Sequence, residues 1–113
     1  MKAVCLCQGG NTRSVACGFV LKYSYGIDAI ACGWEKNSPQ TLEMLFNWAD
    51  HIFIMQKEFE HFVPVDYHPK LHVIDVGPDV WFNSLHPDLI SKVGTLLDPL
   101  TFCEREIPDF SLG

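Results

Sequence analysis

The chain has 113 residues, 48% of them apolar and 19% charged, with a formal net charge of −6 and a sequence pI of about 5.1. This acidic balance argues against nucleic acid as a partner, because nucleic-acid affinity is built from patches of lysine and arginine. We expect neither a membrane partner nor a signal peptide, because no apolar run approaches the roughly 20 residues of a membrane-spanning helix and the chain enters a strand-like run at once.

Short apolar strands alternate with amphipathic helices along the chain. This alternation predicts an α/β fold, a single-domain, doubly wound, four-stranded parallel sheet with helices on both faces. We expect one domain over residues 1–113, with its core at about 2–98 and an irregular tail at 99–113. Ligands bind such sheets beyond the carboxyl ends of the strands. The predicted strands are Ala3–Leu6, Ile27–Cys32, His51–Met55 and Leu71–Val76.

The predicted helices have clear starts and apolar faces. Ser38-Pro39 offers a capping oxygen followed by proline at the first helical position, and Pro87 opens the last helix. Residues 56–70 carry no clear pattern beyond a helical turn at 56–61. In the helix after the first loop, the spacing i, i+3, i+4, i+7 predicts a core-facing set of Ala16, Phe19, Val20 and Tyr23.

The five cysteines form neither a disulfide framework nor a zinc pattern, because their number is odd and no Cys-x-x-Cys pair occurs. Cys5, Cys17 and Cys32 lie among apolar residues and are predicted to be small buried side chains. This use of cysteine fits a reducing cytoplasm. No His-x-x-x-His pair falls on a predicted helix, and we expect no metal and no cofactor.

The loop after the first strand places an arginine six residues after a cysteine, around two glycines. Glycines let several backbone N–H groups turn inward, and the following helix adds unpaired N–H groups and the positive end of its dipole. A tetrahedral dianion fits such a cup, and the guanidinium of Arg13 can hold two phosphate oxygens. The same donors, with a hydroxyl at Ser14, stabilise a nucleophilic thiolate at Cys7.

A simpler interpretation of this loop is a Gly-Gly turn between a strand and a helix, with a buried cysteine and a surface arginine. The other common phosphate loop, Gly-x4-Gly-Lys-[Ser/Thr], is absent from the sequence. The sequence therefore argues against a nucleotide triphosphatase of that type.

The segment from Cys7 to Ser14 resembles the active-site loop of the low-molecular-weight protein tyrosine phosphatases, Cys-x5-Arg-Ser directly after the first strand. The resemblance covers roughly residues 2–98. It implies a metal-independent phosphatase that acts through a phosphocysteine on a phosphorylated protein or a small aryl phosphate. The supporting segments are Ala31-Cys32-Gly33, Trp48 to Met55 and Gly77 to Trp81.

The resemblance also implies roles for individual residues. Cys7 would attack phosphorus, and Asp79 would protonate the leaving oxygen and then deprotonate water. Asp75 is the alternative acid, ranked lower because it lies inside a predicted strand. Trp34 and Trp81 are candidate substrate walls. The phosphate-binding loop would consist of Gln8, Gly9, Gly10, Asn11, Thr12, Arg13 and Ser14.

The sequence departs from the family pattern at several points. Gly10 stands where the family usually has an asparagine that braces the loop, and Val80 replaces a proline after the acid. The proline and the glutamate typical after the Arg-Ser pair are missing, and the chain reads Val15-Ala16-Cys17 there. The stretch after the second strand is also shorter than usual, which removes part of the substrate wall. These changes bear on substrate and rate more than on the fold.

Three other functions remain open at this stage. An anion-binding module with weak or no turnover would keep the loop alone. An arsenate reductase on the same fold would need resolving thiols, for which Cys17 and Cys32 are the only near candidates. A phosphocarrier with a phosphorylated cysteine is disfavoured by Arg13 and Asp79. The sequence does not define an oligomeric state.

Overall fold

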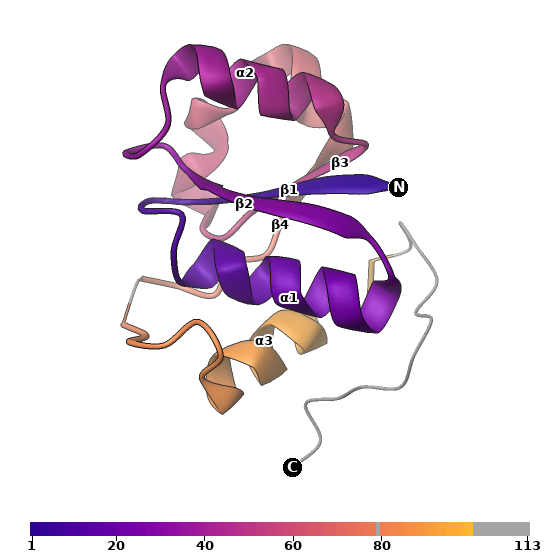
Figure 1. The fold of residues 1–113 in the computed structure, drawn as a ribbon, viewed down its shortest axis with the longest axis vertical. Helices are drawn as coiled ribbons and strands as arrows, with labels where there is room; N and C mark the ends of the chain where they lie inside the picture. The colour runs from indigo at the N-terminus through magenta and orange to yellow at the C-terminus, as the bar shows by residue number, and fades with distance from the viewer. Residues whose placement is uncertain (79, 101–113) are drawn as a thin grey trace.

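The computed structural model describes residues 1–78 and 80–100. Its four strands form one parallel sheet in the order β2-β1-β3-β4, with α2 on one face and α1 and α3 on the other (Figure 1). This arrangement confirms the predicted doubly wound fold. The elements are β1 (Lys2–Cys7), α1 (Arg13–Tyr25), β2 (Asp28–Gly33), α2 (Pro39–Trp48), β3 (His51–Ile54), the 3-10 helices η1 (Lys57–Phe62) and η2 (Val65–Lys70), β4 (Leu71–Val73) and α3 (Pro87–Leu97).

The centre of the sheet is β1, which pairs with β2 on one side and with β3 on the other. Ala3, Val4, Cys5 and Leu6 are fully buried. Helices cover both faces of this strand, so both of its side-chain rows must be apolar, and the unbroken apolar run in the sequence meets that requirement. Removing a buried side chain such as Leu6 costs about 2–5 kcal/mol of stability.

Helix α1 buries only half of the set that its spacing predicted: Ala16 and Val20 are buried. Phe19 is only half-buried and Tyr23 is 50% exposed, and their rings contact each other with centroids 4.8 Å apart. The prediction was wrong for Phe19 and Tyr23 because α1 lies between the sheet and α3, so it is covered on two sides (Figure 1). The buried set is Arg13, Ser14, Ala16, Cys17, Val20, Leu21, Ser24 and Tyr25.

The starts of α2 and α3 follow from local chemistry. The hydroxyl of Ser38 accepts a hydrogen bond from the Thr41 N–H at 3.1 Å, and proline occupies the first turn, as predicted. His86 caps α3 in the same way, since its Nδ1 accepts from the Asp88 N–H at 3.1 Å. Within the described residues no helix combines the length and apolar character that crossing a membrane requires.

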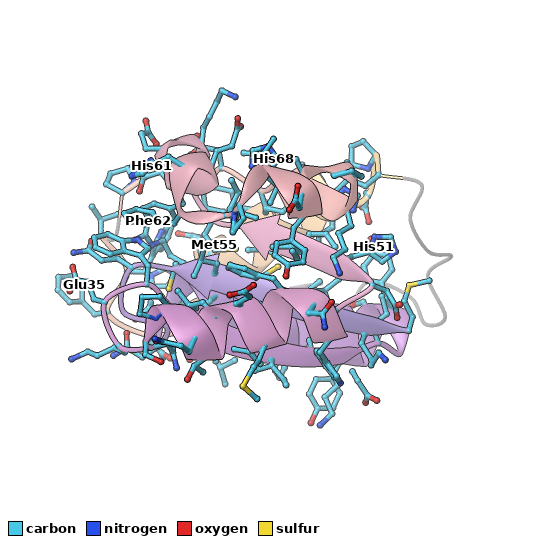
Figure 2. All side chains as sticks on the ribbon, turned by 90° about the horizontal axis from the view of Figure 1, so that it is seen from above. Glu35, His51, Met55, His61, Phe62 and His68 are labelled. Carbon is cyan, nitrogen blue, oxygen red and sulfur yellow. The ribbon has the colours of Figure 1, made fainter. Side chains whose placement is uncertain are left out.

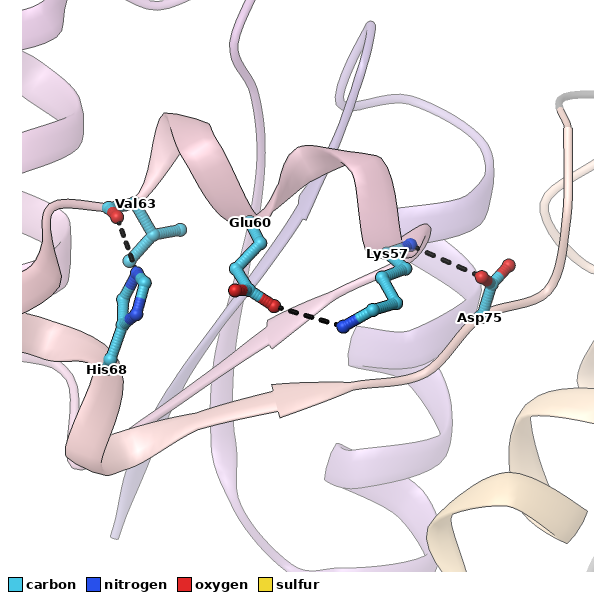
Figure 3. A network of polar contacts seen from close by, with 5 residues as sticks. All are labelled: Lys57, Glu60, Val63, His68 and Asp75. Carbon is cyan, nitrogen blue, oxygen red and sulfur yellow. Dashed lines mark hydrogen bonds and ion pairs between the residues drawn. The ribbon is translucent and has the colours of Figure 1, made fainter.

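The fourth strand is shorter than predicted, because β4 ends at Val73 instead of Val76. The chain stays bonded to the end of β3 through the Ile74 N–H, which donates to the Ile54 carbonyl at 2.8 Å. Asp75 is exposed, and its carboxylate accepts from the Lys57 N–H at 3.3 Å (Figure 3) and from the Gly77 N–H at 2.9 Å. This carboxylate joins the exit of β4 to the start of η1.

A histidine pair joins β3 to β4 at the end of the sheet away from the loop. His51 Nδ1 and His72 Nε2 are 3.0 Å apart, and the His72 ring stacks on Phe53 with centroids 4.9 Å apart. Burial lowers the pKa of both imidazoles. Lys70 and the amino terminus lower the pKa of His51 further, while Asp50 opposes them.

We predict that acid weakens this fold through the histidine pair. Because both pKa values lie below the unfolded value of 6.5, the unfolded chain binds more protons, and stability present above about pH 6.5 is lost as pH falls through the folded pKa values. Urea midpoints measured from pH 7.5 to 5 should therefore fall. His72→Phe keeps an aromatic ring on Phe53 but removes one imidazole, and should reduce the slope. An unchanged wild-type midpoint would contradict this prediction.

Candidate active site

The loop between β1 and α1 begins at a buried thiol. Cys7 is the last residue of β1 and is 2% exposed, and Arg13 is the first residue of α1. The Gly10 N–H donates to Cys7 Sγ at 3.2 Å, and the thiol donates to Ser14 Oγ at 3.1 Å. The Thr12 side chain does not cap α1, so its first N–H groups remain for another acceptor. The loop lies at the same end of the sheet as the connections after β2 and β4 (Figure 1).

The loop packs on the end of β2 through two glycines. Gly10 has φ of +74°, and a Cβ at this position would lie 2.7 Å from the Gly33 nitrogen and 2.8 Å from the Cys32 carbonyl carbon. A Cβ on Gly33 would in turn lie 2.5 Å from the Gly10 nitrogen. The Trp34 N–H donates to the Cys7 carbonyl at 3.2 Å. The main chain of β2 therefore braces the loop, and a side chain at residue 10 has no space.

Arg13 is only 1% exposed, so the simpler interpretation of a surface arginine is wrong. Its Nη1 donates to Gln56 Oε1 and to the Gly77 carbonyl, both at 2.8 Å. The guanidinium carbon lies 5.3 Å from the centroid of the Phe59 ring. One edge of the guanidinium is thus held by the segments that follow β3 and β4.

The charge of Arg13 has no carboxylate partner among residues 1–78 and 80–100, where the one ion pair joins Lys57 to Glu60. Its Nε is buried and has no hydrogen-bond acceptor in that part of the chain. A buried cation with neutral partners is costly unless an anion completes it. A phosphate group on the Nε side would supply both the missing charge and the missing acceptor.

Trp34 lies directly beside the loop, as its candidate role requires. Its ring stacks on Phe62 with centroids 4.3 Å apart and meets Phe59 edge-on at 6.1 Å. Figure 2 shows Phe62 at the same end of the sheet as Glu35, opposite His51. Trp34, Phe59 and Phe62 therefore form one aromatic cluster that adjoins Arg13 through Phe59.

The structure gives less support to the other predicted site residues, Trp81, Asp79 and Asp75. Trp81 is half-buried against the core and meets His86 edge-on at 5.4 Å, so its role as a substrate wall stays a prediction. Asp79 lies outside the described residues. Asp75 no longer lies inside a strand, but two main-chain N–H groups occupy its carboxylate.

Two of the buried cysteines behind the loop, Cys5 and Cys32, are poorly suited to act as thiolates. Cys5, Cys17 and Cys32 are buried, as predicted. Burial raises the pKa of Cys32 to about 12, and burial with a hydrogen bond to Cys17 raises the pKa of Cys5 well above its usual value. A thiol acts as a nucleophile only as a thiolate. The raised pKa of Cys32 therefore argues against this residue as a resolving thiol in arsenate reduction.

Sequence reasoning missed the residues that position Arg13. Gln56 and Gly77 follow β3 and β4, and Phe59 belongs to η1. The carboxyl ends of parallel strands meet at one edge of the sheet. Gln56 is the first residue after the third predicted strand, so its position alone made it a candidate site residue. Nothing in the sequence marks Phe59 as the ring beside the guanidinium.

Solved structures with the same fold are phosphatases. A YwlE mutant from Bacillus subtilis is 15% identical, with a TM-score of 0.59 over 87% of this chain and 92% of that chain. Vibrio vulnificus Wzb in complex with benzylphosphonate is also 15% identical, with a TM-score of 0.58 over 87% and 92%. A protein tyrosine phosphatase from Entamoeba histolytica is 16% identical, with a TM-score of 0.52 over 87% and 90%.

The likeness to these proteins lies in structure alone. No protein-family model matches the chain, and no curated protein matches it in sequence. At 13–16% identity the similarity shows the fold of the low-molecular-weight phosphatases, with its four-stranded parallel sheet. Which residues act, and on what, must be argued from the site.

We predict that Gly10→Ala destabilises the protein, because the new Cβ meets the β2 main chain and L-residues avoid positive φ at a cost of roughly 1–2 kcal/mol. Urea unfolding should show at least that loss. Gly94→Ala in α3 is the matched control: its Cβ meets nothing within 4 Å, and alanine favours a helix over glycine by roughly 0.5–1 kcal/mol. Equal midpoints for the two variants would contradict the close contact.

A second prediction tests the unpaired charge of Arg13. Gln56→Glu places a carboxylate against Nη1 in nearly the same shape, and should lower the affinity for inorganic phosphate about tenfold or more by neutralising the guanidinium. Titration calorimetry measures this affinity. Gln40→Glu, the same change on an exposed position of α2, is the control. Undiminished phosphate binding in Gln56→Glu would remove Arg13 from the anion site.

Proposed function

We propose that this protein is a metal-independent phosphomonoester hydrolase that acts on phosphotyrosine or another aryl phosphate through a phosphocysteine on Cys7. The observation that carries the proposal is the buried guanidinium of Arg13, which has neutral partners on one edge and, within residues 1–78 and 80–100, no acceptor for its Nε. A loop with a thiol at its start and a buried, uncompensated cation at its end suits a phosphate dianion.

The proposed reaction has two displacements. The Cys7 thiolate attacks phosphorus as the bond to the leaving oxygen breaks, and water then attacks the phosphocysteine and releases phosphate and the thiolate. The Gly10 N–H and the Ser14 hydroxyl are the groups already at the sulfur, and a thiolate accepts hydrogen bonds from both. Arg13, with the main-chain amides from Gln8 to Ser14, would stabilise the charge on the equatorial oxygens.

Asp79 is the proposed general acid and base. It follows Gly77 by two positions, and the Gly77 carbonyl accepts from Arg13. In the first displacement it would protonate the leaving oxygen, and in the second it would take a proton from water. The exposed carboxylate of Asp75 is a weaker candidate, because it is engaged by the N–H groups of Lys57 and Gly77.

The aromatic border favours an aryl phosphate. Trp34, Phe59 and Phe62 form a contiguous ring cluster beside Arg13. Such a border can pack against a substrate ring while the phosphate enters the loop. By name the structural neighbours include a protein tyrosine phosphatase and an arginine phosphatase. Phosphoarginine peptides should therefore be tested as substrates beside phosphotyrosine peptides.

The test is hydrolysis of para-nitrophenyl phosphate between pH 5 and 8 with EDTA and reductant. Wild type should turn over, Cys7→Ser should fall to background, and acid-quenched wild type should carry one phosphoryl group on Cys7 by mass spectrometry. If the wild type binds phosphate without turnover, the protein is an anion-binding module. If activity survives in Cys7→Ser, the mechanism is wrong.

A comparison of two carboxylate variants identifies the general acid. Asp79→Asn should lower kcat/KM for para-nitrophenyl phosphate by roughly 10²- to 10⁴-fold, the usual contribution of a general acid. Asp75→Asn, the matched control, should retain most of the activity, because its amide oxygen still accepts one of the N–H groups of Lys57 and Gly77 and Asp75 is not the proposed acid. The reverse result would assign the acid to Asp75.

A further inference from the structure

A cavity of about 430 Å³ lies between α2 and the segment around η1, next to the connection that follows β2. Figure 2 shows His61 and Phe62 together near this end of the molecule. The volume falls within the range of about 300–1,000 Å³ that is typical of ligand pockets. The side chains that matter for its chemistry are Trp34, Leu42, Glu43, Phe46, His61 and Phe62.

The cavity and the candidate active site share a wall. Trp34 lines the cavity, and its main-chain N–H is bonded to the Cys7 carbonyl. Phe62 also lines the cavity and stacks on Trp34, while Phe59 lies between this ring pair and Arg13. In an extended peptide, a residue three positions from the phosphorylated one lies up to about 10 Å from it. A peptide bound in the loop can therefore extend over Trp34 toward the cavity.

The charge of the cavity favours a cationic guest. Among the residues that the structure describes, its lining includes Glu43 and neither lysine nor arginine. Glu43 is exposed and has no ion pair or hydrogen bond with any residue in the described ranges. Aromatic rings attract a cation beside them, and the methylene stem of arginine or lysine packs on apolar walls such as Leu42 and Phe46. A second phosphate or an acidic side chain would be repelled here.

We propose that this cavity is a specificity subsite that binds the cationic side chain of an arginine or lysine near the phosphorylated residue of a polypeptide substrate. The inference rests on the proposed phosphatase function and adds the sequence context of its substrate. Glu43 supplies the counter-charge, and Trp34 and Phe62 supply the aromatic wall. None of these residues takes part in the chemical step.

The test uses phosphotyrosine peptides with one arginine at each position from −3 to +3, against matched peptides with neutral citrulline. In wild type, the best arginine peptide should exceed its citrulline partner in kcat/KM by about three- to tenfold, as expected for one cation at a partly exposed aromatic site. Glu43→Gln should abolish this preference without changing turnover of para-nitrophenyl phosphate. Glu58→Gln, an equal change at an exposed residue outside the cavity lining, should retain it.

A binding measurement separates this inference from the proposed function. Titration of N-acetylarginine methylamide should shift the Trp34 indole N–H resonance in wild type and not in Glu43→Gln, whether or not the protein turns over. Equal kcat/KM for arginine and citrulline peptides in wild type, or a preference that survives in Glu43→Gln, would overturn the subsite. Absence of turnover on every phosphate substrate would overturn the proposed function instead, and an unmoved indole resonance would then overturn the subsite too.

Discussion

The constraint on which the candidate site depends is the buried charge of Arg13. A guanidinium at 1% exposure must be held by its surroundings, and the structure provides a glutamine and a main-chain carbonyl from the segments after β3 and β4. These neutral partners accept hydrogen bonds from the Arg13 guanidinium without cancelling its charge, so its positive field remains available to an anion. The doubly wound sheet makes this possible because parallel strands deliver three separate connections to one edge.

The thiol end of the loop is organised by main-chain contacts instead. Gly10 places an N–H on Cys7 Sγ only because its φ is positive, and its close approach to Gly33 fixes that conformation. The main chain at Gly10 packs directly on β2. Trp34 follows Gly33 in the sequence, and the bond from its N–H to the Cys7 carbonyl holds it against the loop, where it contributes to the aromatic border.

Much of this organisation was predictable, because it is encoded locally. The strand pattern, the Ser38 cap and the Cys7-to-Arg13 spacing each involve residues that are near one another in the chain. The inward face of α1 was predicted only in part, since it depends on α3, which follows far along the sequence. Gln56 and the Trp34–Phe62 stack were missed for the same reason: their partners are set by tertiary packing, and η1 carries no strong periodic signal.

The contact between Gly10 and Gly33 links two regions that are distant in sequence. It joins main chain to main chain, so no side-chain rotamer is available to absorb a change on either side. A bulkier residue at one position is tolerated only if the other segment moves away, and that movement would also carry the amide off the sulfur. Substitutions at residues 10 and 33 are therefore coupled energetically, and their effects on stability should not add independently.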